Sequence, residues 1–122
     1  MNRGRKFSFE QHLKALIYAL LTNQRKWSDV EPKLVDIDRL FFNYDEEKIL
    51  TYPGEYFEKG IRQLRCGNIS IKSQMANLNA NIFMLIKIEE DYGSLDDYVV
   101  SKAPDVIVKE LSSGIYKLKG IG

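Results

Sequence analysis

The side chains that most often do chemistry in proteins are sparse in this sequence. His12 is the single histidine and Cys66 the single cysteine, and one of each is too few for the usual zinc sites. His12 lies beside the apolar face of a predicted helix, where a surface or half-buried role is commoner than catalysis. Cys66 has no histidine near it in the sequence, so inert packing is the better interpretation. The carboxylate pairs fall at or near predicted helix ends, where solvated faces and dipole partners are commoner than acid–base couples: Glu46/Glu47, Glu89/Glu90 and Asp96/Asp97.

Three polar stretches have residue types that suit binding. The first is "LLTNQRKW", residues 20–27, where a buried helix is predicted to end and large polar side chains follow: Asn23, Gln24, Arg25 and Lys26. It is either an exposed binding segment or an inter-helix turn in which Trp27 plugs the core. The second places Lys59, Arg62 and Arg65 at i, i+3 and i+6 of one helix, a spacing that is usually a solvated face. The third is the terminal "YKLKGIG", residues 116–122.

The composition is that of an ordinary globular protein. The 122 residues are 44% hydrophobic and 29% charged, with a net charge of +1. This predicts one helical domain over residues 1–122 and argues against a purely electrostatic nucleic-acid binder, although a local basic surface remains compatible. A single cysteine fits a reducing compartment. No apolar run is long enough for a secretory signal or a membrane span, so we expect a cytoplasmic protein without a membrane partner.

Apolar residues recur at helical spacing along the chain and predict an all-α multi-helix bundle of about six to eight helices. A capping box of Ser8 and Gln11 predicts that the first helix starts near residue 9 and ends near residue 22. A second box, Ser28 with Glu31, predicts the start of the next one. Asp45 is expected to cap a short helix, and another should cover residues 55–64.

The second half of the chain is predicted to contain the longest helix. It should open at Asn68 or Ser70 and run to about residue 92, with Gly93 after its end. Ser94 is then expected to cap a short helix, and the last one should begin at Pro104 and close at Gly114.

Taken in order, these stretches resemble the helix-hairpin-helix DNA glycosylase superfamily, the group that includes endonuclease III. An early helix in that family ends in a pattern like L-L-S-x-Q, which residues 20–24 match with Thr in place of Ser. A short polar segment then precedes a long helix, as "CGNISIKSQMANL" does here. The family hairpin L-P-G-V-G is similar to residues 118–122, with Lys119 in place of Pro. The segment "EDYGSLDDYVV" also resembles the 3-methyladenine glycosylase I branch, but the purine-contacting Glu of that branch falls at Ala19, so no base specificity is assigned.

The resemblance implies that the chain contacts duplex DNA, including damaged DNA. In the family, hairpin N–H groups bind a phosphate, and the Gln of the first motif fills the gap left by a flipped base. By position, these contacts fall on Asn23, Gln24, Arg25, Lys26, Lys117, Lys119, Gly120 and Gly122. Some members also bind a monovalent cation through hairpin carbonyls, which here would be those of Tyr116, Leu118 and Ile121.

The resemblance covers only the N-terminal part of a glycosylase domain, ending inside the hairpin before the family's catalytic Asp. We therefore assign no catalytic residue and expect a base-excision-repair protein whose chain does not excise bases by itself. The alternative is a non-enzymatic helical domain that binds DNA or protein. Missing helices should also leave apolar side chains exposed at Ile82, Leu85, Val106 and Val108, and covering them would favour a homodimer.

Overall fold

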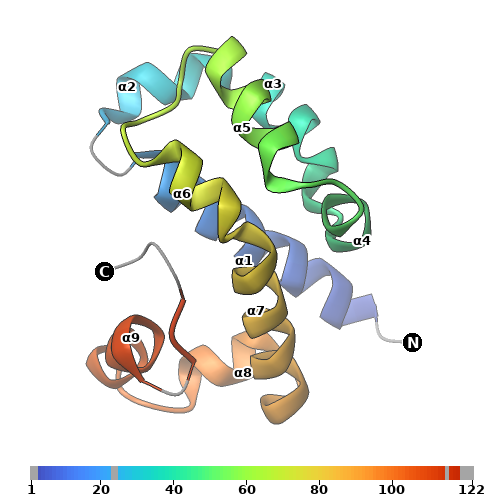
Figure 1. Cartoon of the computed structure of the whole chain (residues 1–122). Coiled ribbons are helices and arrows are strands. Elements are labelled where there is room, and N and C mark those ends of the chain that lie inside the picture. The colour runs from blue at the N-terminus through green and yellow to red at the C-terminus, as the bar shows by residue number, and fades with distance from the viewer. Residues whose placement is uncertain (1–2, 23–24, 115, 119–122) are drawn as a thin grey trace.

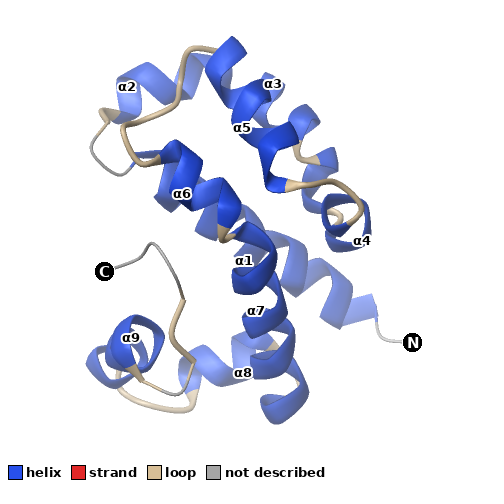
Figure 2. Cartoon of the chain, in the orientation of Figure 1, coloured by secondary structure: helices blue, strands red, loops and turns tan. Residues whose placement is uncertain are grey.

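The structure is a computed structural model that describes residues 3–22, 25–114 and 116–118, the first six of them by backbone alone. Within these ranges the chain is helical and has no strand, which confirms the all-α prediction (Figure 2). None of the helices described combines the length and apolar character needed to cross a bilayer. The helices are α1 (Arg3–Thr22), α2 (Trp27–Val30), α3 (Leu34–Leu40), α4 (Glu46–Leu50), α5 (Gly54–Gln63), α6 (Ile71–Ala76), α7 (Leu78–Tyr92), α8 (Leu95–Val100) and α9 (Pro104–Ser113), with 3₁₀ turns η1 (Glu31–Lys33) and η2 (Phe42–Tyr44).

Helix α1 crosses the molecule, and the other elements lie around it (Figure 1). Elements α2, η2 and α8 each contact α1. The apolar stripe predicted for this helix is buried, namely Leu13, Leu16, Ile17, Leu20 and Leu21. Burial of apolar area yields about 25 cal/mol per Å², so this stripe makes α1 the axis of the core.

Several local predictions for the helix ends are confirmed. The Asp45 carboxylate accepts hydrogen bonds from the N–H groups of residues 47 and 48 at the start of α4. The Ser94 hydroxyl accepts one from the N–H of Asp97 at the start of α8. Gly93 follows α7 with a positive φ of 89°, which glycine tolerates without a Cβ clash. Helix α9 runs from Pro104 to Ser113, with Gly114 at its end.

Both predicted capping boxes are wrong. Helix α1 begins at Arg3 rather than near residue 9, because the preceding Arg and Lys residues are themselves good helix formers. Helix α2 begins at Trp27, one residue before Ser28, with Lys26 in extended conformation as its N-cap. An S-x-x-E or S-x-x-Q pattern inside a helix therefore has no capping role here.

The long helix predicted up to residue 92 is two helices, α6 and α7, and the path of the chain bends between them (Figure 1). The interruption is Asn77, whose φ of −98° and ψ of 0° lie outside the α-helical region. Its side-chain amide donates to the carbonyl of Ser73 at 2.9 Å. The Asn77 backbone N–H donates to the same carbonyl at 3.1 Å, so the side-chain bond adds to the backbone bond and does not replace it. Helix α6 ends there, and the longest helix described is α1 with 20 residues.

The prediction of uncovered core is only half right. Ile82 and Leu85 of α7 are buried, because they join the same apolar core as α1 and α8. Val106 and Val108 of α9 are 40% and 64% exposed. Dimerisation through these two valines remains a prediction, and sedimentation equilibrium at micromolar concentration would test it: a single species at 14.2 kDa contradicts it.

The turn η2 has an uncommon backbone. Phe42, Asn43 and Tyr44 are three successive non-glycine residues with positive φ, between 52° and 66°, a conformation that costs energy at each residue. The Asp38 carboxylate holds the turn by accepting hydrogen bonds from the hydroxyls of Tyr18 at 2.5 Å and Tyr44 at 2.6 Å. Burial, with the bond to Asp38, raises the pKa of Tyr18 to about 12, so these hydroxyls stay protonated and able to donate.

Helices α5 and α6 pack so closely at Gly54 that no side chain fits there. A Cβ at this position would lie 2.3 Å from the carbonyl oxygen of Met75. We expect Gly54→Ala to lower the free energy of unfolding by about 1–3 kcal/mol, the usual cost of overpacking. Urea denaturation measures it.

Gly60→Ala is the matched control, because it lies in the same helix and its Cβ would meet only the Leu40 side chain. That side chain can rotate away, so the loss should be smaller. Equal stability of the two variants would contradict the close contact between the backbones of α5 and α6.

Candidate nucleic-acid interface

The C-terminal end of α1 is capped by side chains from far along the chain. The amide of Asn68 donates to the carbonyl of Leu20 at 2.9 Å, and the amide of Gln74 donates to the same oxygen at 3.0 Å. Helix ends leave carbonyls without intrahelical partners, and Gln74 is only 1% exposed. These bonds therefore fix the polar segment before α6 against the first motif.

Arg25 also holds the polar segment before α6, through two hydrogen bonds to its backbone. Its Nη1 donates to the carbonyl of Gly67 at 2.8 Å and its Nη2 to that of Arg65 at 2.9 Å. The two bonds hold Arg65 at a φ of 60°, in the left-handed region. The buried Nε of Arg25 has no hydrogen-bond partner among the described residues. Arg25, predicted from the sequence as a DNA contact, is thus first a clamp on this turn.

Three arginines meet around one concavity as a result. Arg25, Arg62 and Arg65 line it with Gly67, Asn68 and Ile71, and its volume is about 270 Å³. We call this the arginine hollow. Arg62 also pairs with Glu58 of its own helix, with Nε 2.9 Å from Oε2, whereas no ion pair to Arg65 is found within the described ranges. The hollow is therefore a cationic surface with one internal counter-charge.

Cys66 follows Arg65 of the hollow in the sequence and is enclosed by the core. Cys66 is buried, and burial raises the pKa of its thiol, while the charges of Arg25 and Lys33 act in the opposite direction. A protonated, enclosed thiol agrees with the inert role expected for it.

Trp27 does not plug the core, because it is 46% exposed and lies beside Tyr18 with the ring centroids 6.2 Å apart. Lys26 is exposed.

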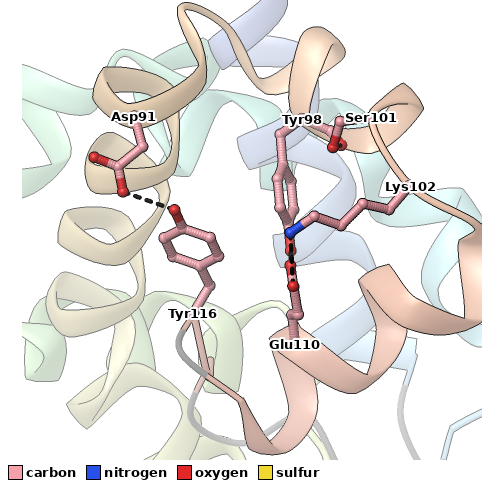
Figure 3. Close-up of polar contacts among 6 residues, drawn as sticks. All are labelled: Asp91, Tyr98, Ser101, Lys102, Glu110 and Tyr116. Atoms are coloured by element: carbon pink, nitrogen blue, oxygen red, sulfur yellow. Dashed lines mark hydrogen bonds and ion pairs between the residues drawn. The ribbon is translucent and has the colours of Figure 1, made fainter.

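The segment before the predicted hairpin is held by a polar cluster (Figure 3). The Tyr116 hydroxyl donates to Asp91 at 2.7 Å, and the Tyr98 hydroxyl donates to Glu110 at 2.8 Å. Lys102 donates to the other oxygen of Glu110 at 2.7 Å. The rings of Tyr98 and Tyr116 are in edge contact, with centroids 5.3 Å apart. The cluster joins α7, α8 and α9 to the end of the described chain.

Electrostatics keeps this cluster in one protonation state near neutral pH. Hydrogen bonds from Lys102 and Tyr98 lower the pKa of Glu110, and the bond from Tyr116 lowers the pKa of Asp91. The bond to Glu110 raises the pKa of Lys102. A lysine held charged and a carboxyl held ionised suit an anchor better than a nucleophile or a general acid.

The described part of the predicted hairpin packs against α9 and α1. Leu118 is buried and its N–H donates to the carbonyl of Leu111 at 2.7 Å. It lines an apolar cleft of about 250 Å³ with Ala15 and Ala19 of α1, so the C-terminal segment reaches the last turns of that helix. Lys117 is exposed. The predicted contacts Asn23, Gln24, Lys119, Gly120 and Gly122 lie outside the described residues, as does Ile121 of the predicted cation site.

Among the described residues, His12, the single histidine of the chain, contacts an acidic side chain and belongs to no metal cluster. His12 Nε2 lies 2.7 Å from Asp96 Oδ1, which connects α1 to α8 near the rim of the apolar cleft. In the part of the chain that is described, no three His, Cys, Asp or Glu side chains gather as around a metal ion. The cation site that the resemblance implies uses backbone carbonyls and is not tested by this.

Comparison of the chain with known protein families, with curated proteins and with solved structures gives no match in any of the three. The glycosylase resemblance therefore remains an interpretation of the motifs, and the physical case for function rests on the arginine hollow.

No sequence pattern identifies the two side chains that cap α1 and hold the segment beside the hollow. The pattern around Asn68 predicts only a helix start, and none singles out Gln74. Both lie about fifty residues from the carbonyl that they cap, so no local pattern marks them. The basic spacing of Arg62 and Arg65 was visible, but its meaning depended on Arg25 meeting them.

Tyr116→Phe should change how stability depends on pH. The bond to Asp91 raises the pKa of Tyr116 from its ordinary 10.0 to about 12. The unfolded chain therefore loses this proton first, and the contribution is full below pH 10 and lost as the pH rises to about 12. We expect the variant to melt below the wild type at pH 8, and the difference in Tm to narrow at pH 11.

Tyr56→Phe is the control, because this tyrosine is exposed and no hydrogen bond of its hydroxyl is found among the described residues. A constant difference in Tm between wild type and Tyr116→Phe at both pH values would show that the hydroxyl does not anchor the segment.

Proposed function

We propose that this chain is a helical DNA-binding domain, built like the N-terminal part of a helix-hairpin-helix glycosylase, that binds the phosphates of duplex DNA. The observation that carries the proposal is the arginine hollow, where Arg25, Arg62 and Arg65 surround a concavity of about 270 Å³. Guanidinium groups bind phosphate oxygens in a forked geometry. Arg62 and Arg65 supply the guanidinium groups that face a phosphate, whereas Arg25, whose Nη atoms already donate to backbone carbonyls, contributes its charge. Together they form a local cationic surface on a chain whose net charge is only +1.

The position of the hollow also supports the proposal. It lies where the family motif L-L-S-x-Q ends, and exposed Lys26 adds a further cation there. In the proposal, Asn23 and Gln24, which precede Arg25 in the sequence, also contact the duplex, and Lys117, Lys119, Gly120 and Gly122 supply a second contact. Base excision is the reaction of the family and gives the context of the DNA contact. The proposal does not extend to that reaction, because no residue of this chain is assigned to it.

The test is binding of a fluorescent 20-base-pair duplex, followed by anisotropy over a range of salt concentrations. Arg62→Ala/Arg65→Ala removes two charges without breaking the clamp made by Arg25. Each lost phosphate contact should make the salt dependence of log K shallower by about 0.9, so the double variant should bind more weakly with a visibly flatter slope.

Lys48→Ala/Lys109→Ala is the matched control, because it removes the same charge from exposed positions on α4 and α9. A third variant, Glu58→Gln, removes the counter-charge of Arg62 and should tighten binding. If the arginine and lysine double variants lower affinity and slope equally, the hollow is not the DNA contact.

A further inference from the structure

A second surface feature lies on the other end of α5. Tyr52 and Tyr56 are 38% and 40% exposed, and their ring centroids are 4.6 Å apart. Phe42 backs both rings, at 5.2 Å from Tyr52 and 6.3 Å from Tyr56. We call the two tyrosines the tyrosine platform. Solvent-exposed aromatic pairs of this kind offer π faces to a flat ligand.

The platform is held rigidly from below. Phe42 is the first residue of the left-handed turn η2, which Asp38 fixes through the hydroxyls of Tyr18 and Tyr44. The fully buried Phe57 meets the Tyr56 ring edge to face at 5.1 Å. The two partly exposed rings are therefore held in place, and a ligand need not order them on binding.

The platform opens into a concavity at the start of α5. Its volume is about 560 Å³, within the range of small-ligand sites, and its other lining residues are Pro53, Glu55, Glu58, Lys59 and Lys72. Lys59 and Lys72 are exposed, and no ion pair of either is found within the described residues. Glu58 already pairs with Arg62, so an anionic ligand meets two lysines and one unshared carboxylate, that of Glu55.

The cations continue from this concavity into the arginine hollow. Lys59 and Arg62 are three residues apart on α5 and so share a face, and Arg62 lines the hollow. Tyr56 and Arg62 are six residues apart, about 9 Å along the helix axis. The two residues also lie about 120° apart around the helix, with Lys59 between them. At about 3.4 Å per nucleotide in one stacked strand, the axial part of this path alone corresponds to two or three nucleotides.

From this arrangement we propose that the tyrosine platform stacks an unpaired base of single-stranded DNA, while Lys59, Lys72 and the arginine hollow bind its phosphates. Stacking on aromatic rings within a cationic groove is how proteins bind single strands without sequence preference. The carboxylate of Glu55 at the rim can accept a hydrogen bond from the amino group of a base. The inference deepens the proposed DNA binding, because it names an unpaired strand as the partner of the α5–α6 face.

The experiment measures anisotropy of a fluorescent 12-nucleotide single strand and of the 20-base-pair duplex with the same protein samples. Tyr52→Leu/Tyr56→Leu keeps an apolar cover over Phe42 but removes both π faces. We expect its affinity for the single strand to fall about tenfold with an unchanged salt slope, because stacking releases no counterions. Its affinity for the duplex should stay at the wild-type value.

Tyr52→Phe/Tyr56→Phe is the matched control and should retain single-strand affinity, because stacking uses the ring and not the hydroxyl. Lys59→Ala/Lys72→Ala, at exposed positions, gives a second readout if the leucine variant does not fold: it should weaken single-strand binding and flatten its salt slope. Unchanged single-strand affinity in either the leucine or the lysine variant overturns the proposal.

The outcomes separate this inference from the proposed duplex contact. Wild-type protein that binds the single strand through the platform but not the duplex refutes the duplex proposal alone. Wild-type protein that binds the duplex, with single-strand affinity indifferent to the tyrosines, refutes the platform alone. Binding of a proline-rich peptide or an oligosaccharide that needs the tyrosines, without binding of the single strand, also overturns it.

Discussion

The arrangement of the surface depends on which groups donate hydrogen bonds to the carbonyls at the C-terminal end of α1. The carbonyl of Leu20 accepts amide hydrogen bonds from Asn68 and Gln74, and a buried acceptor left without a partner costs about 1–3 kcal/mol. Among the described residues, both side chains that donate to this oxygen come from far along the chain, and their bonds hold the polar segment before α6 against the end of α1. These bonds bring two parts of the chain about fifty residues apart into register, and the first motif and the α5–α6 face meet there.

Once the segment is in register, Arg25 determines the electrostatics. Its guanidinium bonds the carbonyls of Arg65 and Gly67, so its position is fixed although its charge remains. Arg62 and Arg65 then share a concavity with a third cation that cannot swing away. Like charges held close repel one another, and an anion relieves that repulsion. A cationic site built on a fixed arginine is therefore preorganised for a phosphate, unlike scattered lysines on a mobile surface.

Sequence patterns predicted the fold where stability is local. The buried stripe of α1, the caps at Asp45 and Ser94, and the glycine after α7 depend on residues a few positions apart, and all were confirmed. The failures concern where helices begin and end. The backbone of Asn77 leaves the α-helical region between α6 and α7, and helix formers before Ser8 extend α1 past the residue expected to cap it. Ile82 and Leu85 were expected to be exposed because the resemblance implies that later helices of the family cover them, but they share a buried core with residues of α1 and α8.

The candidate site was predictable in its parts but not as a whole. Arg25, Arg62 and Arg65 were each visible as cations, yet a basic helix face and a polar turn are both common and carry little meaning separately. Tertiary packing gives them a shared concavity, and the same packing exposes Tyr52 and Tyr56 over Phe42, a residue in a backbone conformation that no sequence pattern announces. A left-handed turn of three non-glycine residues persists only where its surroundings enforce it. Because this turn lies beneath the exposed tyrosines, the core contacts that enforce its conformation also determine the shape of the surface above it.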